Sequence, residues 1–140
     1  PTEAVTDADI ICAATTSSTP VLHYQDLKSG VHINGVGSFQ PSMQEIDSET
    51  IKNAIVFVDS RESALSETGD LTIPIQEGII GKNHLRAEIG ELLENPSLGR
   101  NTPDEITFFK SCGVAVQDVV AAGMALEQAK KHNLGRIIRM

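Results

Sequence analysis

The chain has 140 residues, with 11 basic and 19 acidic side chains and a formal net charge of −8. This length suits a single domain with a sizeable core. The acidic balance argues against a surface for nucleic acid or for an anionic membrane. No apolar run approaches the ~20 residues that a bilayer span requires, and the first residues lack the pattern of a secretory signal. We therefore expect a cytoplasmic protein that binds neither nucleic acid nor a membrane.

The sequence shows no spacing typical of a metal site or of a disulfide framework. Cys12 and Cys112 lie far apart, without any C-x-x-C pattern. No two of the 4 histidines have the spacing of metal ligands. We expect no bound metal and no disulfide, and a reducing compartment is the simplest interpretation.

The first part of the chain alternates apolar runs with polar loops. Residues 8–14 (A-D-I-I-C-A-A) predict a buried strand, and the small polar residues 15–20 predict a loop after it. Residues 31–36 predict a second strand. A cap at residues 47–48 then favours a short helix that runs to Ala54.

The middle of the chain predicts one more strand and two helical segments. Residues 55–59 (I-V-F-V-D) are continuously apolar up to the aspartate, as the strands of parallel sheets are. Residues 60–65 predict a helical turn that ends near Gly69. Residues 85–93 place leucine and isoleucine on one face, which predicts an amphipathic helix that Pro96 ends.

The last part predicts a strand and the strongest helix of the sequence. Residues 106–109 form the fourth apolar run, and residues 114–132 carry apolar side chains around most of a helical circumference. Such a pattern is typical of a helix that is buried on several sides. Asn133 and Gly135 suit its carboxyl-terminal cap.

Strands that alternate with helices indicate an α/β fold with a parallel sheet and right-handed crossovers. Gly35 and Gly37 lie at the end of the second predicted strand. The fourth strand runs into a small polar turn within F-F-K-S-C-G, residues 108–113. Loops at the carboxyl ends of such strands bind nucleotides, and glycine lets bare backbone approach a flat ligand. The G-x-G-x-x-G of a first dinucleotide-binding turn is absent. We therefore expect a nucleotide-binding domain whose first βαβ unit is missing.

Nine short motifs follow one another along nearly the whole chain. They are A-D-I-I-x-x-A-T (residues 8–15), P-V-L (20–22), H-I-N-G-V-G (32–37), P-x-M-x-E-I-D (41–47), V-D-S (58–60), G-D-L (69–71), E-I-G-E-L (88–92), G-R (99–100) and F-K-S-C-G (109–113). Each motif alone is weak evidence. In this order they resemble the ornithine cyclodeaminase and mu-crystallin family of NAD(P)-dependent enzymes.

The resemblance implies a homodimer of two-domain subunits, more than twice as long as this chain. A substrate and dimerisation domain would precede a Rossmann-type NAD(P)-binding domain. Residues 1–112 would be the later part of the Rossmann domain. Residues 113–140 would be a carboxyl-terminal helix and tail that pack back on the sheet and on the missing amino-terminal domain. The family's glycine fingerprint, its substrate-binding lysine and arginine, and the group that discriminates NAD from NADP would precede this chain.

The resemblance also implies which residues of this chain bind the coenzyme, NAD or NADP. Thr15 matches a threonine in a loop that contacts the coenzyme. Ser111 matches a serine in the last coenzyme loop, at the start of the long helix. The segment beneath the nicotinamide matches Val36, Gly37, Ser38 and Phe39. Small residues let the ring approach, and a hydroxyl at a helix N-terminus favours a polar or anionic partner.

Phe39 departs from the pattern of the cyclodeaminases, in which the resemblance implies an aspartate that handles protons. A phenyl ring cannot exchange a proton, and Glu45 lies six residues further on, beyond the proline. We therefore assign no catalytic residue to this chain. Relatives with an aromatic or small residue here resemble imine or ketimine reductases, or relatives of alanine dehydrogenase. In these, hydride transfer to a preformed C=N bond needs orientation and positive charge more than a local carboxylate. The expected function is oxidoreduction of a small, often cyclic, α-imino or amino acid.

Two alternatives remain open. An ornithine cyclodeaminase would convert ornithine to proline and ammonia, and would need a proton-handling carboxylate near the nicotinamide. A crystallin-like ligand-binding protein would keep the coenzyme loops without turnover. In each case we expect the 140-residue chain alone to be inactive, because half of the coenzyme site and all of the substrate site would lie outside it.

Five further polar residues have a functional and a structural interpretation, and for each we favour the structural one. His32, within a strand, fits a core or subunit contact better than a base. Asp59 and Asp70 fit caps of turns or helices. Cys112 fits a small buried hydrophobe better than a reactive thiol, although it lies near a helix start. Arg100 fits a structural salt bridge better than a ligand contact.

Overall fold

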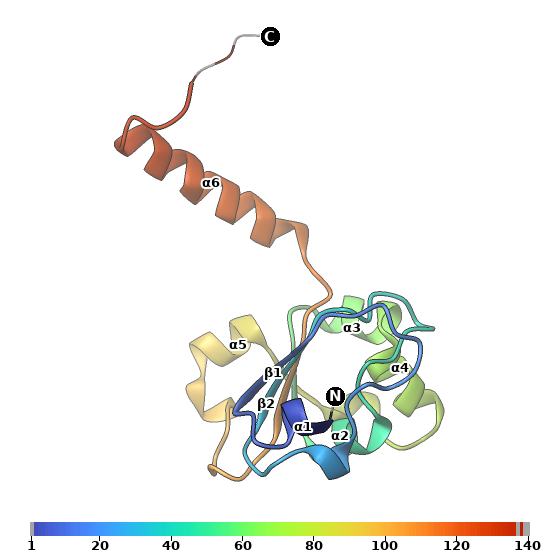
Figure 1. The fold of residues 1–140 in the computed structure, drawn as a ribbon. Coiled ribbons are helices and arrows are strands. Elements are labelled where there is room, and N and C mark those ends of the chain that lie inside the picture. Colours follow the sequence, from blue (N-terminus) through green and yellow to red (C-terminus); the bar gives the residue numbers. More distant parts are fainter. Residues whose placement is uncertain (1, 137, 139–140) are drawn as a thin grey trace.

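The computed structural model describes residues 2–136 and 138 and has one parallel sheet at its centre (Figure 1). Residues 1, 137 and 139–140 lie outside the described residues. They belong to the ends of the two segments expected from the sequence, residues 1–112 and 113–140. The strands pair in the order β1-β2-β5-β3-β4, and each of these pairs is parallel. They are β1 (Ile10–Ala13), β2 (His32–Gly35), β3 (Ile55–Val58), β4 (Leu85–Glu88) and β5 (Thr107–Lys110). The predicted α/β fold with a parallel sheet is confirmed.

The strands end together at one edge of the sheet, which we call the carboxyl edge. Ala13 of β1 lies opposite Gly35 of β2, and Gly35 lies opposite Lys110 of β5. Lys110 in turn lies opposite Val58 of β3. Loops that follow four different strands therefore emerge side by side at this edge.

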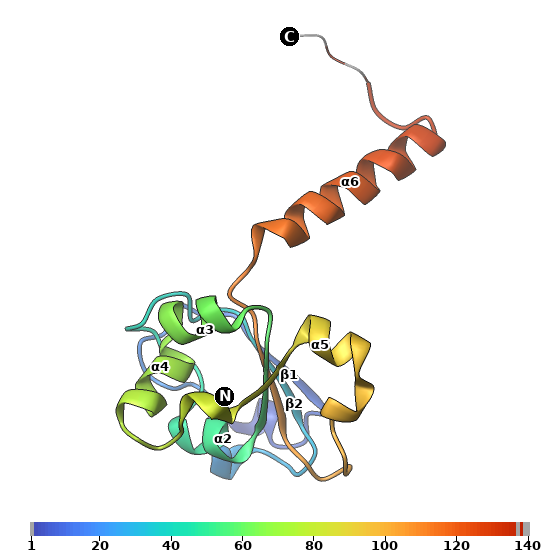
Figure 2. The same ribbon diagram turned by 180° about the vertical axis from the view of Figure 1, so that it is seen from behind.

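Helices cover the two faces of the sheet unequally, as Figure 1 and Figure 2 show. On one face the strand residues Ile33 and Phe108 pack with Ile51 and Leu71 of the helices in a buried cluster. The other face carries the short helix α5 (Ile89–Glu94), against which η3 (Pro96–Leu98) packs. The remaining helical segments of this body are α1 (Thr2–Val5), η1 (Tyr24–Asp26), α2 (Ser48–Asn53), α3 (Arg61–Glu67), α4 (Gly69–Gln76) and η2 (Lys82–His84).

Asp47 caps α2, as predicted. One carboxylate oxygen accepts a hydrogen bond from the Thr50 N–H at 2.8 Å, and the other accepts one from the Tyr24 N–H at 3.2 Å. Such a cap satisfies an amide that the first turn of a helix leaves free. The predicted helical turn over residues 60–65 is α3, where the Ser60 side chain caps the first turn in the same way.

The prediction of a single helix over residues 85–93 is wrong. Residues 85–88 form strand β4 beside β3, and helix α5 begins only at Ile89. A capping box separates the two elements, in which the Glu88 N–H donates to the Glu91 carboxylate at 2.7 Å. Apolar residues at this spacing fit either element locally, and pairing with β3 selects the strand.

Helix α4 was not predicted. Gly69 and Pro74 usually break helices, yet both lie inside α4. A β-carbon at Gly69 would lie 2.1 Å from the Met43 carbonyl oxygen, so glycine here lets the helix start directly against the preceding loop. The reason for this helix is therefore tertiary packing, which local propensity does not contain.

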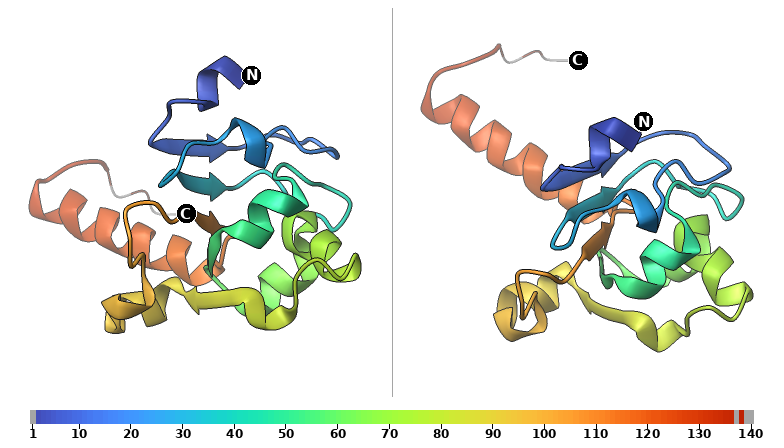
Figure 3. Two further views of the ribbon diagram at one scale, coloured as in Figure 1. Left: turned by 90° about the horizontal axis from the view of Figure 1, so that it is seen from below. Right: turned by 60° about the horizontal axis from the view of Figure 1, so that its bottom comes forward.

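The long helix α6 (Ala115–Lys131) forms as predicted, and Asn133 follows it in the left-handed conformation at φ 54°. Figure 1 and Figure 2 show α6 extending away from the sheet beyond the carboxyl edge, and the right-hand view of Figure 3 agrees. Its apolar side chains are exposed, among them Val119 and Met124. Within the described residues the helix is thus neither buried on several sides nor packed on the sheet, contrary to our expectation. Its packing on a further domain stays a prediction.

Removal of the Asp47 cap tests this account of α2. We expect Asp47→Ala to lower the free energy of unfolding by about 1 to 2 kcal/mol, because the Thr50 and Tyr24 amides lose their acceptor. Urea denaturation followed by circular dichroism measures the change. The control is Glu49→Ala, which removes an exposed carboxylate of the same helix and should stay within about 0.5 kcal/mol of the parent. Equal losses in the two variants would contradict the cap.

Candidate functional site

The carboxyl edge brings together the residues that the sequence predicts as coenzyme contacts. Thr15 follows β1, residues 36–39 follow β2, and Ser111 follows β5. Because β2 lies between β1 and β5, the three loops are neighbours. Thr15 is exposed, Val36 and Phe39 are 51% and 53% exposed, and Ser111 is half-buried. The edge therefore presents two apolar side chains and two hydroxyl groups on adjacent loops.

Gly37 lies where two of these loops touch. A β-carbon at Gly37 would lie 2.0 Å from the Thr15 carbonyl oxygen and 2.4 Å from the Thr15 nitrogen. Gly35 is also confined, since a β-carbon there would lie 2.7 Å from the ring of Phe108. In this chain both glycines are thus required for internal packing. The close approach to a ligand that we expected of them stays a prediction.

Glu45 joins the same two loops from the buried side. Its carboxylate is fully buried, and one oxygen accepts a hydrogen bond from the Thr15 N–H. The other oxygen accepts from the N–H groups of Gly37 at 2.8 Å and Ser38 at 3.1 Å. Sequence reasoning weighed Glu45 only as a substitute for the missing aspartate and did not foresee this role. The P-x-M-x-E-I-D motif was the available signal, but no local rule indicates an acceptor for an amide 30 residues away.

The Ser38 side chain points into the interior and forms its hydrogen bonds there. Ser38 is fully buried, and its hydroxyl donates to the Met43 carbonyl oxygen at 2.6 Å and lies 2.8 Å from Thr68 Oγ1. Its N–H is taken by Glu45. In this structure Ser38 holds its own loop in place, and its contact with a coenzyme stays a prediction.

A buried ion pair lies behind Glu45. Asp70 of α4 and Lys110 of β5 are both fully buried, with Asp70 Oδ2 3.6 Å from Lys110 Nζ. Asp70 Oδ1 accepts from the N–H groups of Glu45 at 2.7 Å and Ile46 at 3.1 Å, while Lys110 donates to the Gly35 carbonyl oxygen at 3.1 Å. Burial raises the pKa of Asp70, and the lysine and the two amides oppose that rise. Asp70 is therefore not the simple cap that we expected, because it pairs with a cation inside the core.

Asp59 holds the loop after β5, in agreement with the expected cap. One carboxylate oxygen accepts from the Ser111 hydroxyl at 3.2 Å and from the N–H groups of Cys112 and Gly113, both at 2.8 Å. The Ser111 hydroxyl thus donates its hydrogen bond to Asp59, and its oxygen lone pairs remain available to accept hydrogen bonds. Burial, together with the nearby Asp59 charge, raises the pKa of the Cys112 thiol to about 11. A thiol that stays protonated agrees with the interpretation of Cys112 as a small hydrophobe.

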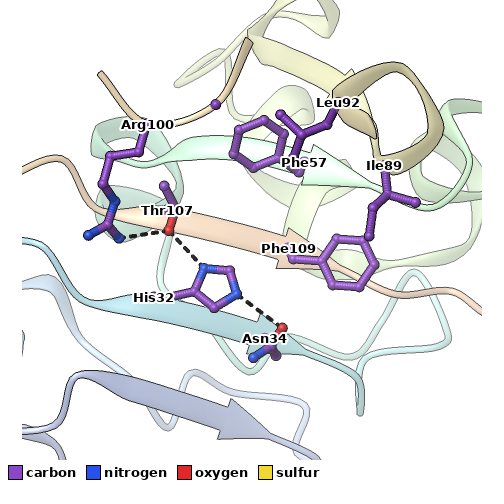
Figure 4. Close-up of a pocket in the computed structure, with 9 residues that line it drawn as sticks. His32, Asn34, Phe57, Ile89, Leu92, Arg100, Thr107 and Phe109 are labelled. Carbon is purple, nitrogen blue, oxygen red and sulfur yellow. Dashed lines mark hydrogen bonds between the residues drawn. The ribbon is translucent and has the colours of Figure 1, made fainter. Parts of the chain in front are cut away.

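A separate cavity of about 460 Å³ lies on the sheet face beside α5 (Figure 4). None of the six predicted coenzyme contacts lines it. The two ring nitrogens of His32 lie 2.7 Å from Thr107 Oγ1 and 3.2 Å from Asn34 Oδ1, so His32 has the satisfied position that we expected. Arg100 donates to Thr107 Oγ1 at 3.0 Å and to the Val31 carbonyl oxygen at 3.4 Å. These acceptors are neutral, and the ion pairs among the described residues do not include the expected salt bridge of Arg100. The structural interpretation of Arg100 stays a prediction.

Neither a metal site nor a membrane segment is found in the part of the chain that the structure describes. Among residues 2–136 and 138, no three histidine, cysteine, aspartate or glutamate side chains are grouped so that they could hold a metal ion. No helix of the described residues is long and apolar enough to cross a membrane. Cys12 and Cys112 are both free.

Comparison with known proteins finds relatives that match along nearly the whole chain. Delta(1)-pyrroline-2-carboxylate reductase of Bacillus cereus is 47% identical over 137 residues, which are 97% of this chain and 42% of the relative. The solved structure of Delta(1)-pyrroline-2-carboxylate reductase of Thermococcus litoralis in complex with NADH and L-proline is 39% identical, with a TM-score of 0.91 over 98% of this chain and 42% of that one. An archaeal alanine dehydrogenase dimer with bound NAD is 35% identical, with a TM-score of 0.87 over 100% of this chain and 43% of that one.

The chain therefore spans about 42% of the length of the reductases that it matches. The similarity in structure confirms that the sheet and its helices are a partial Rossmann-type unit, as the motifs indicated. The profile of the Ornithine cyclodeaminase/mu-crystallin family matches residues 1–133. With the order of its motifs, its parallel sheet and this match all in agreement, the chain belongs to the ornithine cyclodeaminase/mu-crystallin family.

Proposed function

We propose that this chain orients the nicotinamide half of NAD or NADP in a cytoplasmic enzyme that transfers hydride between the coenzyme and the C=N carbon of a small α-imino acid. The observation that carries the proposal is the meeting of three predicted coenzyme loops at the carboxyl edge, where α/β sheets bind nucleotides. Relatives that bind NADH and NAD support it. Because the chain spans less than half of those relatives, the activity is proposed for the whole protein.

The side chains exposed at the carboxyl edge support the proposal. Val36 and Phe39 expose apolar side chains against which a flat ring can pack. Thr15 and Ser111 place hydroxyl groups on the two flanking loops, where they can orient a carboxamide. When bound, the coenzyme supplies or accepts the hydride. The residues of this chain hold the ring and exclude water from it, which keeps the reacting carbons aligned.

The acidic side chains bonded to these loops are already engaged, which favours a reductase over a cyclodeaminase. Glu45 is buried and accepts three backbone N–H groups. Asp59 accepts from Ser111 and the two amides that follow it. Phe39 takes the position where the resemblance implies a proton-handling aspartate. Reduction of a preformed imine adds a hydride to its carbon and a proton to its nitrogen. Orientation of the reacting carbons and a cation for the substrate carboxylate do not require a carboxylate at position 39, and the proton would come from groups outside this chain or from solvent.

We further propose that residues 113–140 pack on a domain that precedes residues 1–112 in the whole protein, and that a homodimer forms through that domain. The exposed apolar side chains of α6, Val116, Val119, Val120, Met124 and Leu126, need such a partner. The match to the Thermococcus litoralis reductase extends over 98% of this chain and therefore includes α6. The alanine dehydrogenase relative is a dimer.

An activity assay on the full-length protein tests the proposed reaction. We expect oxidation of NADH or NADPH that depends on a cyclic α-imino acid, without release of ammonia from ornithine in the same preparation. Absorbance at the reduced nicotinamide band measures the first reaction, and a coupled ammonia assay measures the second. Ammonia and proline from ornithine would show that a proton-handling group lies elsewhere and would contradict the reductase. Coenzyme binding without either turnover would favour a crystallin-like ligand-binding protein.

The isolated 140-residue chain should bind reduced coenzyme poorly. It offers the proposed nicotinamide loops, but the G-x-G-x-x-G turn that faces the pyrophosphate is absent from its sequence. Fluorescence titration with NADH and NADPH measures the affinity, with the full-length protein as the reference. A dissociation constant in the micromolar range for the chain alone would contradict the division of the coenzyme site between the two parts.

Replacement of the Ser111 hydroxyl tests the loop after β5. We expect Ser111→Leu in the full-length enzyme to raise the coenzyme KM by about tenfold, because a bulky apolar group replaces the acceptor at the edge. The control is Ser66→Leu, on the exposed surface of α3, which should leave that KM unchanged. An unchanged coenzyme KM in Ser111→Leu would remove Ser111 from the site.

A further inference from the structure

We propose that Glu45 is a positioning residue for the coenzyme, which fixes the loop after β1 against the loop after β2 without touching a ligand itself. This inference rests on the proposed function, since these are two of the proposed coenzyme loops. Glu45 is fully buried, whereas Thr15, Val36 and Phe39 in the loops that it holds are exposed. The carboxylate therefore acts from the buried side of loops whose other side is open to a coenzyme.

The Glu45 carboxylate accepts backbone N–H groups at the point where the backbone pairing of β1 and β2 ends. The Val36 N–H donates to the Ala13 carbonyl oxygen at 2.8 Å, and the Gly37 N–H is shared between that oxygen at 3.3 Å and the Glu45 carboxylate at 2.8 Å. One step further, the amides of Thr15 and Ser38 donate to the Glu45 carboxylate instead of to the neighbouring backbone. A side chain from a distant part of the sequence thus extends the pairing of the two strands into their loops.

The donors around Glu45 require a carboxylate. One oxygen serves Thr15, and the other serves both Gly37 and Ser38. The ion pairs among the described residues do not include Glu45, so the backbone amides compensate its charge. A glutamine side chain would turn its NH₂ group toward at least one of these N–H donors in either orientation. One of the two loops would then lose its anchor while the volume of the side chain stays the same.

Glu45 is itself held firmly enough to set the position of other groups. Its N–H donates to Asp70 Oδ1 at 2.7 Å, and its carbonyl oxygen accepts from the N–H groups of Val21 and Leu22 at 2.8 and 3.1 Å. Asp70 in turn pairs with Lys110 of β5. Because the Glu45 backbone is anchored in the core, its carboxylate holds the two loops at fixed positions relative to the core. We expect the loops to move relative to each other when the carboxylate is removed.

The test is Glu45→Gln in the full-length protein, with Glu49→Gln as the matched control. Glu49 lies exposed on α2 and pairs only with Lys52, at 3.4 Å, among the described ion pairs. We expect Glu45→Gln to raise both the Kd of NADH, measured by fluorescence, and the coenzyme KM by about tenfold. The KM of the imino acid should stay within about twofold of its parent value, and the control should change none of the three constants.

A purely structural role of Glu45 predicts a different result. In that case Glu45→Gln would lower the fraction of folded molecules, and hence the apparent kcat. The Kd of NADH in the folded molecules would stay unchanged, and that outcome would overturn the proposal. Glu45→Asp is the second variant, because it keeps the charge but shortens the side chain by one methylene group. We expect an intermediate rise in the Kd of NADH. If neither variant folds, Glu45 is a folding residue and the proposal is wrong.

The binding measurement also separates this inference from the proposed reaction. If the parent protein binds NADH but reduces no imino acid, the proposed reaction is wrong, while the Kd values of the Glu45 variants still decide the role of Glu45. If the parent protein binds neither NADH nor NADPH, the positioning role falls together with the coenzyme site.

Discussion

A carboxylate removed from water must find hydrogen-bond donors, and the carboxyl edge of this sheet is arranged around that requirement. Glu45 obtains its donors from two loops, after β1 and after β2, rather than from a cation. An unpaired buried charge costs several kcal/mol, so loop conformations that withdraw these amides are strongly disfavoured. One side chain thereby fixes Thr15 and residues 36–39 relative to each other. Gly37 completes the constraint, because any side chain there would collide with Thr15.

The ion pair of Asp70 and Lys110 extends the same constraint to β5 and α4. Buried ion pairs add little stability compared with apolar pairs of the same size, but loss of one partner is costly. Here each partner also holds backbone: Asp70 binds the N–H of Glu45, and Lys110 binds the Gly35 carbonyl oxygen. A contiguous set of bonds therefore links the ends of β1, β2 and β5. These bonds fix the geometry of the three loops relative to one another.

Local pattern was sufficient for elements that local interactions determine. Four strands followed from continuous apolar runs, and α2 followed from its cap at Asp47, because buried parallel strands and capped helices carry these signals in their own residues. Helix α4 was missed because Gly69 makes sense only against the loop that it touches. The candidate coenzyme residues came from family resemblance, not from periodicity. Glu45 escaped prediction because its donors lie in loops that only the folded sheet brings to it.

The division of tasks within the proposed enzyme follows from how this chain uses its charges. Its buried acids, Glu45 and Asp70, are consumed in holding loops, and Asp59 is consumed in holding the turn after β5. Because these three carboxylates accept hydrogen bonds that hold loops, none of them is assigned to proton transfer. Among the proposed coenzyme contacts at the carboxyl edge, Thr15, Val36 and Phe39 are exposed, and a hydroxyl group beside two apolar side chains suits the orientation of a ring. The proposed reaction therefore assigns orientation of the coenzyme to this chain, and binding of the substrate carboxylate and delivery of the proton to the rest of the protein.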